Sequence, residues 1–150
     1  MEIKDSGARR EFDTGAVRDI QVGKGRCDLM PLHVVSMFMC CDDVIYRIAR
    51  FLEDGETRHL YTALHKFCSE AFDDEETMML EVAKHFEAGA LKYGENNWQK
   101  GLPPECYMDS ALRHYLKFKR GDDDEPHDRA FAWNLMCCIW EVDYHAYKDN

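Results

Sequence analysis

Apolar residues recur every three or four positions through most of this 150-residue chain, beginning after residue 31. This spacing is typical of helices that bury one face. It predicts helices over residues 32–52, 57–72, 75–93, 109–120 and 126–147. Few segments alternate with a period of two, and no strand–helix–strand rhythm is present. We therefore expect an all-α fold, a helical bundle of about five helices in a single domain spanning 1–150.

Residues 1–31 show neither the helical spacing of apolar residues nor a period of two, and they contain four glycines. Residues 1–26 carry six Lys or Arg against five acids, whereas the rest of the chain carries thirteen against twenty-four. One interpretation is an irregular basic loop segment that orders around an anion through its backbone N–H groups and cationic side chains. The alternative is a flexible tail. Residues 32–84 read as a helical elaboration, and 85–147 carry most of the candidate chemistry.

Composition excludes several classes of protein. The net charge of −10 argues against nonspecific binding to a nucleic acid polymer. No apolar run reaches the roughly 18 residues that span a bilayer, and the charged first twenty residues lack a secretory signal. The seven cysteines are odd in number and show no CxxC spacing, so we expect reduced thiols in a cytoplasmic protein.

The densest group of chemically active side chains lies between residues 101 and 134. Four acids, residues 122–125, follow Gly121, and Mg²⁺ and Mn²⁺ prefer such oxygen ligands. Asp109, Arg113 and Lys117 share one face of the preceding helix, with His114 at its edge. A solvated loop and a solvated salt-bridge ladder are the alternative interpretations.

Three further residues have two interpretations each. Glu81 or Glu87 could supply a carboxylate to a metal inside the bundle, or could be surface charge. Trp98 could stack on a nucleobase or anchor a loop in the core. No GxGxxG, GxxxxGK[ST], HExxH or GxSxG motif occurs, which removes the commonest alternative chemistries.

Three segments in order carry a resemblance to a known family. They read SGARREFDTGAVRDIQVGKGRCDLMPL near the N-terminus, HFEAGALKYGENNWQKGLP in the centre, and DSALRHYLKF followed by GDDDEPHDRAFAWN. Together they resemble the phage and bacterial dATP/dGTP diphosphohydrolase family, small relatives of MazG among the all-α NTP pyrophosphohydrolases. The resemblance covers residues 6–31 and 85–134.

The resemblance implies a helical bundle that uses Mg²⁺ or Mn²⁺ to hydrolyse a purine deoxynucleoside triphosphate, dATP and/or dGTP, to the monophosphate and pyrophosphate. It implies a homo-oligomer in the cytoplasm, that of the bacterial host if a phage encodes the chain. The catalytic residues that we expect are Glu87, Glu125 and His114, and the metal ligands are Glu87, Asp109, Asp122 and Glu125. The expected substrate-binding residues are Arg9, Arg10, Arg18, Lys24, Arg26, Lys92, Asn97, Trp98, Arg113, His127 and Asn134.

One motif of the MazG relatives is altered in this chain. They carry EExxE on one helix and ExxD on the next, whereas here Glu75 and Glu76 are followed by Met79. Asp122 and Glu125 have the ExxD spacing in reversed order and lie in a turn. The alternative function is therefore a protein that binds or sequesters nucleotides without turnover. A third possibility is a helical interaction protein without a nucleotide site.

Overall fold

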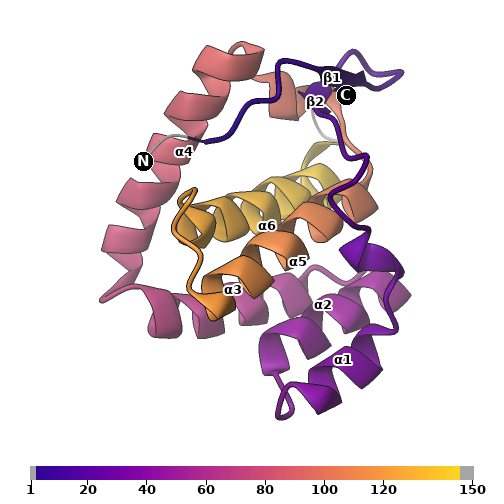
Figure 1. Ribbon diagram of the computed structural model, residues 1–150, viewed down its shortest axis with the longest axis vertical. Coiled ribbons are helices and arrows are strands. Elements are labelled where there is room, and N and C mark those ends of the chain that lie inside the picture. The colour runs from indigo at the N-terminus through magenta and orange to yellow at the C-terminus, as the bar shows by residue number, and fades with distance from the viewer. Residues whose placement is uncertain (1–2, 146–150) are drawn as a thin grey trace.

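The computed structural model describes residues 3–145, which form six α-helices and one small sheet (Figure 1). The helices are α1 (Leu32–Phe38), α2 (Asp43–Asp54), α3 (Arg58–Ala71), α4 (Glu75–Tyr93), α5 (Pro104–Arg120) and α6 (His127–Asp143). This confirms the all-α fold. The predicted end of the last helix near residue 147 lies outside the described residues. Within them, no helix combines the length and apolar character needed to cross a membrane.

The first predicted helix is two helices, and the prediction of one continuous helix over 32–52 is wrong. Between α1 and α2, Cys40 and Cys41 both have left-handed backbones, with φ of 58° and 59°. The side chain of Asp42 then accepts a hydrogen bond from the Ile45 N–H at 2.9 Å and caps α2. A capping acid directly after the break starts a new helix, although the apolar spacing runs on through the break.

Helices α5 and α6 pack along each other at the centre of the molecule, and α1 to α3 lie against one end of this pair (Figure 1). The core between them is rich in aromatic residues. Phe67 of α3 contacts Tyr115 and Phe118 of α5 and Phe131 of α6, with ring centroids 4.3 to 5.9 Å apart. Such aromatic contacts fix how the helices meet as well as burying apolar area.

Helix α5 begins five residues before its predicted start at residue 109. Pro104 is its first residue, where the fixed φ of proline suits a helix and its missing N–H costs nothing. The early start was misread from the sequence because two adjacent prolines and a glycine are also typical of a loop. Its consequence is that Asp109 and Ser110 lie inside the helix, buried, rather than at its end.

Residues 3–31 follow a defined path, so the flexible-tail interpretation is wrong for this part of the chain. Strands β1 (Arg9–Glu11) and β2 (Val17–Asp19) pair antiparallel, and a 3₁₀ turn, η1 (Cys27–Leu29), packs on α5. The amide of Asn97, in the 3₁₀ turn η2 (Asn97–Lys100), bonds both the N–H and the C=O of Val17 at 2.8 Å. One side chain thus supplies β2 with the backbone partners that a third strand would give.

Helix α4 leans away from α5, and the N-terminal segment crosses between them (Figure 1). An N-cap at Asp74 and a C-cap at Gly94 bound this helix. Its contacts are chiefly with α6. One face of α4 is therefore left to form a cavity wall.

Candidate functional site

A cavity of about 570 Å³ lies between α4, α5 and the N-terminal segment. This volume falls within the range of small-molecule sites. Its walls combine cationic, aromatic and acidic groups from parts of the chain far apart in sequence. The expected site residues that line it are Arg10, Arg18, Lys24, Lys92, Asn97, Trp98, Asp109, Arg113, His114 and Glu125.

Arg18 of β2 is the most unusual charge in the cavity. Its guanidinium donates through Nη2 to the Ser110 hydroxyl and the Asn134 amide oxygen, both at 3.3 Å. Its Nη1 is buried without a hydrogen-bond partner, and the partners of its Nη2 among the described residues are neutral. A shielded guanidinium without a counter-ion is costly, and an anionic ligand is the simplest way to neutralise it.

Further cations surround Arg18 at the cavity wall. Lys92 is 9% exposed, and its ammonium donates to the Lys4 carbonyl at 2.6 Å. Lys24 and Lys92 lie 3.6 and 3.8 Å from the Asp19 carboxylate. Lys117 of α5 also lines the cavity, although sequence reasoning placed it only on the Asp109 face. Positive charge on three walls of one cavity favours a polyanionic ligand.

Aromatic rings form a further part of the cavity wall. Phe86 of α4 contacts Trp98 and Trp133, with ring centroids 5.5 and 5.8 Å apart. Trp133 also lies beside the Arg18 guanidinium, 5.7 Å from its ring centroid. Trp98 touches Phe86 and Trp140 and lines the cavity, so it both anchors the loop and faces the site. This wall can take a flat apolar group.

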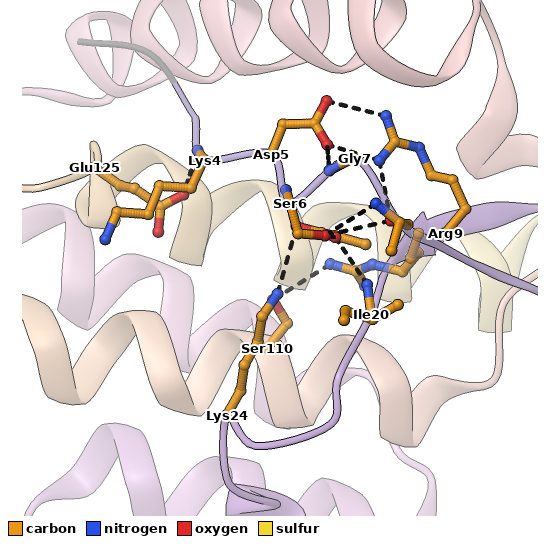
Figure 2. Close-up of polar contacts among 12 residues, drawn as sticks. Lys4, Asp5, Ser6, Gly7, Arg9, Ile20, Lys24, Ser110 and Glu125 are labelled. Atoms are coloured by element: carbon orange, nitrogen blue, oxygen red, sulfur yellow. Dashed lines mark hydrogen bonds and ion pairs between the residues drawn. The ribbon is translucent and has the colours of Figure 1, made fainter.

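Lys4, Asp5 and Ser6 line the cavity, and residues 4–7 form a strap that runs from beside Glu125 toward Arg9, as Figure 2 shows. The Lys4 N–H donates to the Glu125 carboxylate at 2.8 Å, and the Lys4 ammonium lies 2.5 Å from Asp124. Asp5 binds the Gly7 N–H and the Arg9 guanidinium (Figure 2). The strap therefore connects the acidic turn to the basic N-terminal segment.

Two histidines lie under the acidic turn. Their Nδ1 atoms, in His114 of α5 and His127 of α6, are 2.9 Å apart, and His127 Nε2 lies 2.7 Å from Asp124. Burial and the neighbouring His127 lower the pKa of His114 well below its usual range, so this ring is neutral. Ligand atoms of His114, Glu125 and His127 lie within 4.8 Å of one another, as do those of Asp122, Asp124 and His127.

Asp109 differs from the other expected metal ligands in being buried and fully engaged. Its carboxylate accepts hydrogen bonds from the Cys27 N–H at 2.7 Å, from Arg113 at 2.6 Å and from the Gln21 amide. Three donors saturate most of its lone pairs. Asp109 therefore holds the N-terminal segment and Arg113 against α5, and the solvated-ladder interpretation does not apply to it.

The comparison with protein families decides the identity of the chain. Residues 75–150, half of the chain, match the family model described as dATP/dGTP diphosphohydrolase, N-terminal. The chain belongs to this family. No curated protein and no solved structure matches it.

The part that matches the dATP/dGTP diphosphohydrolase family spans α4 to α6, and so includes most of the cavity wall. It contains the aromatic wall, the acidic turn and both histidines. The strap and β2, which carries Arg18, lie outside the matched residues. The family resemblance of residues 6–31 accordingly stays a prediction from the sequence.

Several expected site residues do not line the cavity. Arg9 and Arg26 are exposed and pair with Asp5 and Asp28 through two hydrogen bonds each. Glu87 is exposed on α4, and Asp122 is bound by the neighbouring Arg120. The two remaining residues, His127 and Asn134, lie behind His114 and Arg18 and support them.

The structure adds residues that sequence reasoning missed. His85 and Phe86 line the cavity from α4, and Ser110 holds Arg18. The histidine and phenylalanine begin the HFEAGALKYG segment, so their place in that motif was an available signal. Lys4 had no such signal, because its contacts with residues 124 and 125 depend on the fold alone.

Proposed function

We propose that the chain hydrolyses purine deoxynucleoside triphosphates, dATP and/or dGTP, to the monophosphate and pyrophosphate, in a metal-dependent reaction. The observation that carries this proposal is the uncompensated guanidinium of Arg18 inside a cavity that also has an aromatic wall. Membership of the dATP/dGTP diphosphohydrolase family supports the same reaction. The cysteines are free, as is usual in a reducing cytoplasm, and we propose that location.

In this proposal the triphosphate lies along the cationic side of the cavity. Arg18, Lys92 and Arg113 bind its phosphate oxygens, and Lys24 and Lys117 complete the positive field. Water attacks phosphorus, the bridging bond between the α- and β-phosphates breaks, and pyrophosphate leaves with the charge that these cations stabilise. The Asp19 carboxylate holds Lys24 and Lys92 in place before the substrate arrives.

The proton of the attacking water needs an acceptor near the phosphates. Glu125 and His114 line the cavity on its acidic side, and the neutral ring of His114 keeps a lone pair on one nitrogen. We assign the general base to Glu125, because a carboxylate can accept the proton on one oxygen while its other oxygen holds a cation, whereas the one lone pair of His114 is needed for the cation. Glu87 is a weaker candidate than the sequence implied, since it faces solvent away from the cavity.

The donors beneath the acidic turn fit a divalent cation with mixed nitrogen and oxygen ligands. Glu125, His114 and His127 would hold it, and two imidazoles beside one carboxylate suit Mn²⁺ better than Mg²⁺. Such an ion would neutralise phosphate charge and lower the pKa of a bound water. The saturated carboxylate of Asp109 and the exposed Glu87 are poor additions to this ligand set.

A nucleotide-binding protein without turnover is the second candidate. It is favoured by one observation, namely that Asp109, Asp122 and Asp124 are all engaged by nitrogen donors of the chain itself. Such a protein would keep the cationic and aromatic walls and would bind nucleotides without releasing products.

The proposed function is tested by incubating the protein with each of the four dNTPs in Mn²⁺, in Mg²⁺ and in EDTA, then resolving the products. We expect dAMP or dGMP with pyrophosphate, only when a divalent cation is present. Release of orthophosphate and a diphosphate would contradict the proposed reaction. Intact triphosphates together with calorimetric binding would establish the second candidate in its place.

A further inference from the structure

His85 is a histidine that the proposed reaction does not use. It lies on α4, lines the cavity and is 9% exposed. Its ring lies 5.3 Å from that of Trp133, which also contacts the Arg18 guanidinium. His85 is therefore next to both the aromatic wall and the cationic side.

The hydrogen bonds of His85 are incomplete. Its Nδ1 atom is fully buried and has no partner. A buried N–H without a partner is rarer and costlier than a bare lone pair, which places the ring proton on Nε2. Because Nδ1 is closed off, the ring meets the cavity through its other edge. His85 thus offers the cavity one N–H donor.

The charge state of His85 supports this role. Burial lowers the pKa of His85 to about 3, and the nearby cations Arg129, Arg18 and Lys92 act in the same direction. The ring is neutral at any physiological pH. A neutral donor surrounded by cations adds little to phosphate binding, but it is well suited to a neutral acceptor on a ligand.

Space for such a ligand lies beside the ring. Gly89 is one turn after His85, on the same face of α4, and also lines the cavity. A Cβ atom built on Gly89 meets nothing within 4 Å. Phe86 and Trp133 border this space, which gives it the character of a slot for a flat ring.

We propose that His85 determines the preference for purines by donating a hydrogen bond from Nε2 to N7 of the base. N7 is an acceptor in both adenine and guanine and is absent from pyrimidines. A single N–H donor therefore selects the purine class without separating dATP from dGTP. This inference rests on the proposed function, because it assumes that the cavity binds deoxynucleoside triphosphates.

The test is calorimetric titration in EDTA, where no turnover is expected, with dATP, dGTP, their 7-deaza analogues and pyrophosphate. The unaltered protein should bind each 7-deaza nucleotide about 2- to 12-fold more weakly, the effect of one net hydrogen bond. His85→Phe should bind dATP and 7-deaza-dATP equally and keep its affinity for pyrophosphate. His33→Phe, which changes an exposed histidine on α1, is the matched control and should behave as the unaltered protein.

A second variant makes the test independent of how His85→Phe folds. Gly89→Leu fills the slot beside the ring. This variant should weaken the binding of dATP and dGTP while leaving the binding of pyrophosphate unchanged. Equal binding of dATP and 7-deaza-dATP by the unaltered protein would overturn the N7 contact and leave the proposed function standing. If His85→Phe lost affinity for dATP and for pyrophosphate equally, the ring would contact phosphate, and the N7 contact would be overturned as well. Failure of the unaltered protein to bind any dNTP, in EDTA and with Mn²⁺ alike, would overturn the proposed function and this inference together.

Discussion

The residues that decide how this cavity works are those whose polar atoms lack partners inside the chain. Arg18 and His85 each have a buried nitrogen without a hydrogen bond, and both line the same cavity. Composition and spacing identified Arg18 only as one of several basic residues. Its special position depends on the pairing of β1 with β2 and on the buried Ser110, which no local pattern reveals.

Removing the Arg18 charge should separate binding from stability. We expect Arg18→Met to weaken dATP and pyrophosphate binding about 10- to 100-fold, since hydrogen bonds to charged groups are worth about 1.5–3 kcal/mol. The free energy of unfolding without ligand should not fall, because an uncompensated guanidinium is removed. Calorimetry and urea unfolding measure the two effects. Arg26→Met, an exposed arginine paired with Asp28, is the control and should leave binding unchanged.

The neutral ring of His85 should appear in the pH dependence of stability. Its pKa in the folded chain is about 3 and its ordinary value is 6.5, so between these values the unfolded chain binds more protons. The contribution of the neutral His85 ring to the free energy of unfolding is then fully present above pH 6.5, and it is lost as the pH is lowered toward 3. His85→Phe should lack this component, a difference of up to about 1.4 kcal/mol per pH unit in that window. Urea unfolding at pH 7, 5.5 and 4.5 measures it, and identical pH slopes in the two proteins would contradict it.

At the scale of elements, apolar periodicity predicted which segments are helical, and the local backbone decided where they end. The helix ends at Gly55 and Gly121 could be predicted because glycine easily adopts the positive φ that ends a helix, and both residues have it, at 73° and 87°. The break at Cys40 and Cys41 was not, because two cysteines rarely adopt that conformation. The start of α5 was missed because Pro104 suits both a loop and a first helical turn.

The N-terminal segment shows the limit of sequence patterns most clearly. Its strands are only three residues long, and their order depends on contacts with distant elements, above all with Asn97. Asn97 was expected to bind substrate, whereas its amide oxygen and its amide N–H are both hydrogen-bonded to the backbone of Val17. Its contribution to binding is therefore through the position of β2 and Arg18.

Loss of the Asn97 amide should release this segment. We expect Asn97→Ala to lower the free energy of unfolding by about 1–3 kcal/mol, the cost of leaving buried polar groups unpaired. Hydrogen exchange should accelerate at residues 17–19 more than in α5 or α6. Lys100→Ala, exposed at the end of the same turn, is the control. Unchanged exchange at residues 17–19 would contradict the anchoring role.

At the scale of the whole molecule, the cavity depends on segments that are distant in sequence: the strap, β2, α4, η2, α5 and α6. The sequence contained most of its cationic and aromatic groups, but it could not show which acids face inward. Glu87 and Asp109 illustrate this, since one is exposed and the other is enclosed by donors.

Exposed apolar side chains on two helices support the expectation of a homo-oligomer. Met37 and Phe38 on α1 are 67% and 88% exposed, and Leu80 and Leu91 on α4 are 69% and 84% exposed. Large apolar residues in such number often cover an interface. Light scattering should give at least twice the chain mass of 17.6 kDa. A monomer at every concentration tested would contradict this expectation.

The central claim is that the cavity around Arg18 hydrolyses purine deoxynucleoside triphosphates between the α- and β-phosphates. The most direct measurement is pyrophosphate release from dGTP and dATP in Mn²⁺ by the unaltered protein, Arg18→Met and Arg26→Met in parallel. We predict equal amounts of pyrophosphate and monophosphate from the unaltered protein and Arg26→Met, and a large loss in Arg18→Met. Equal release by all three proteins, or no release by any, would contradict the claim.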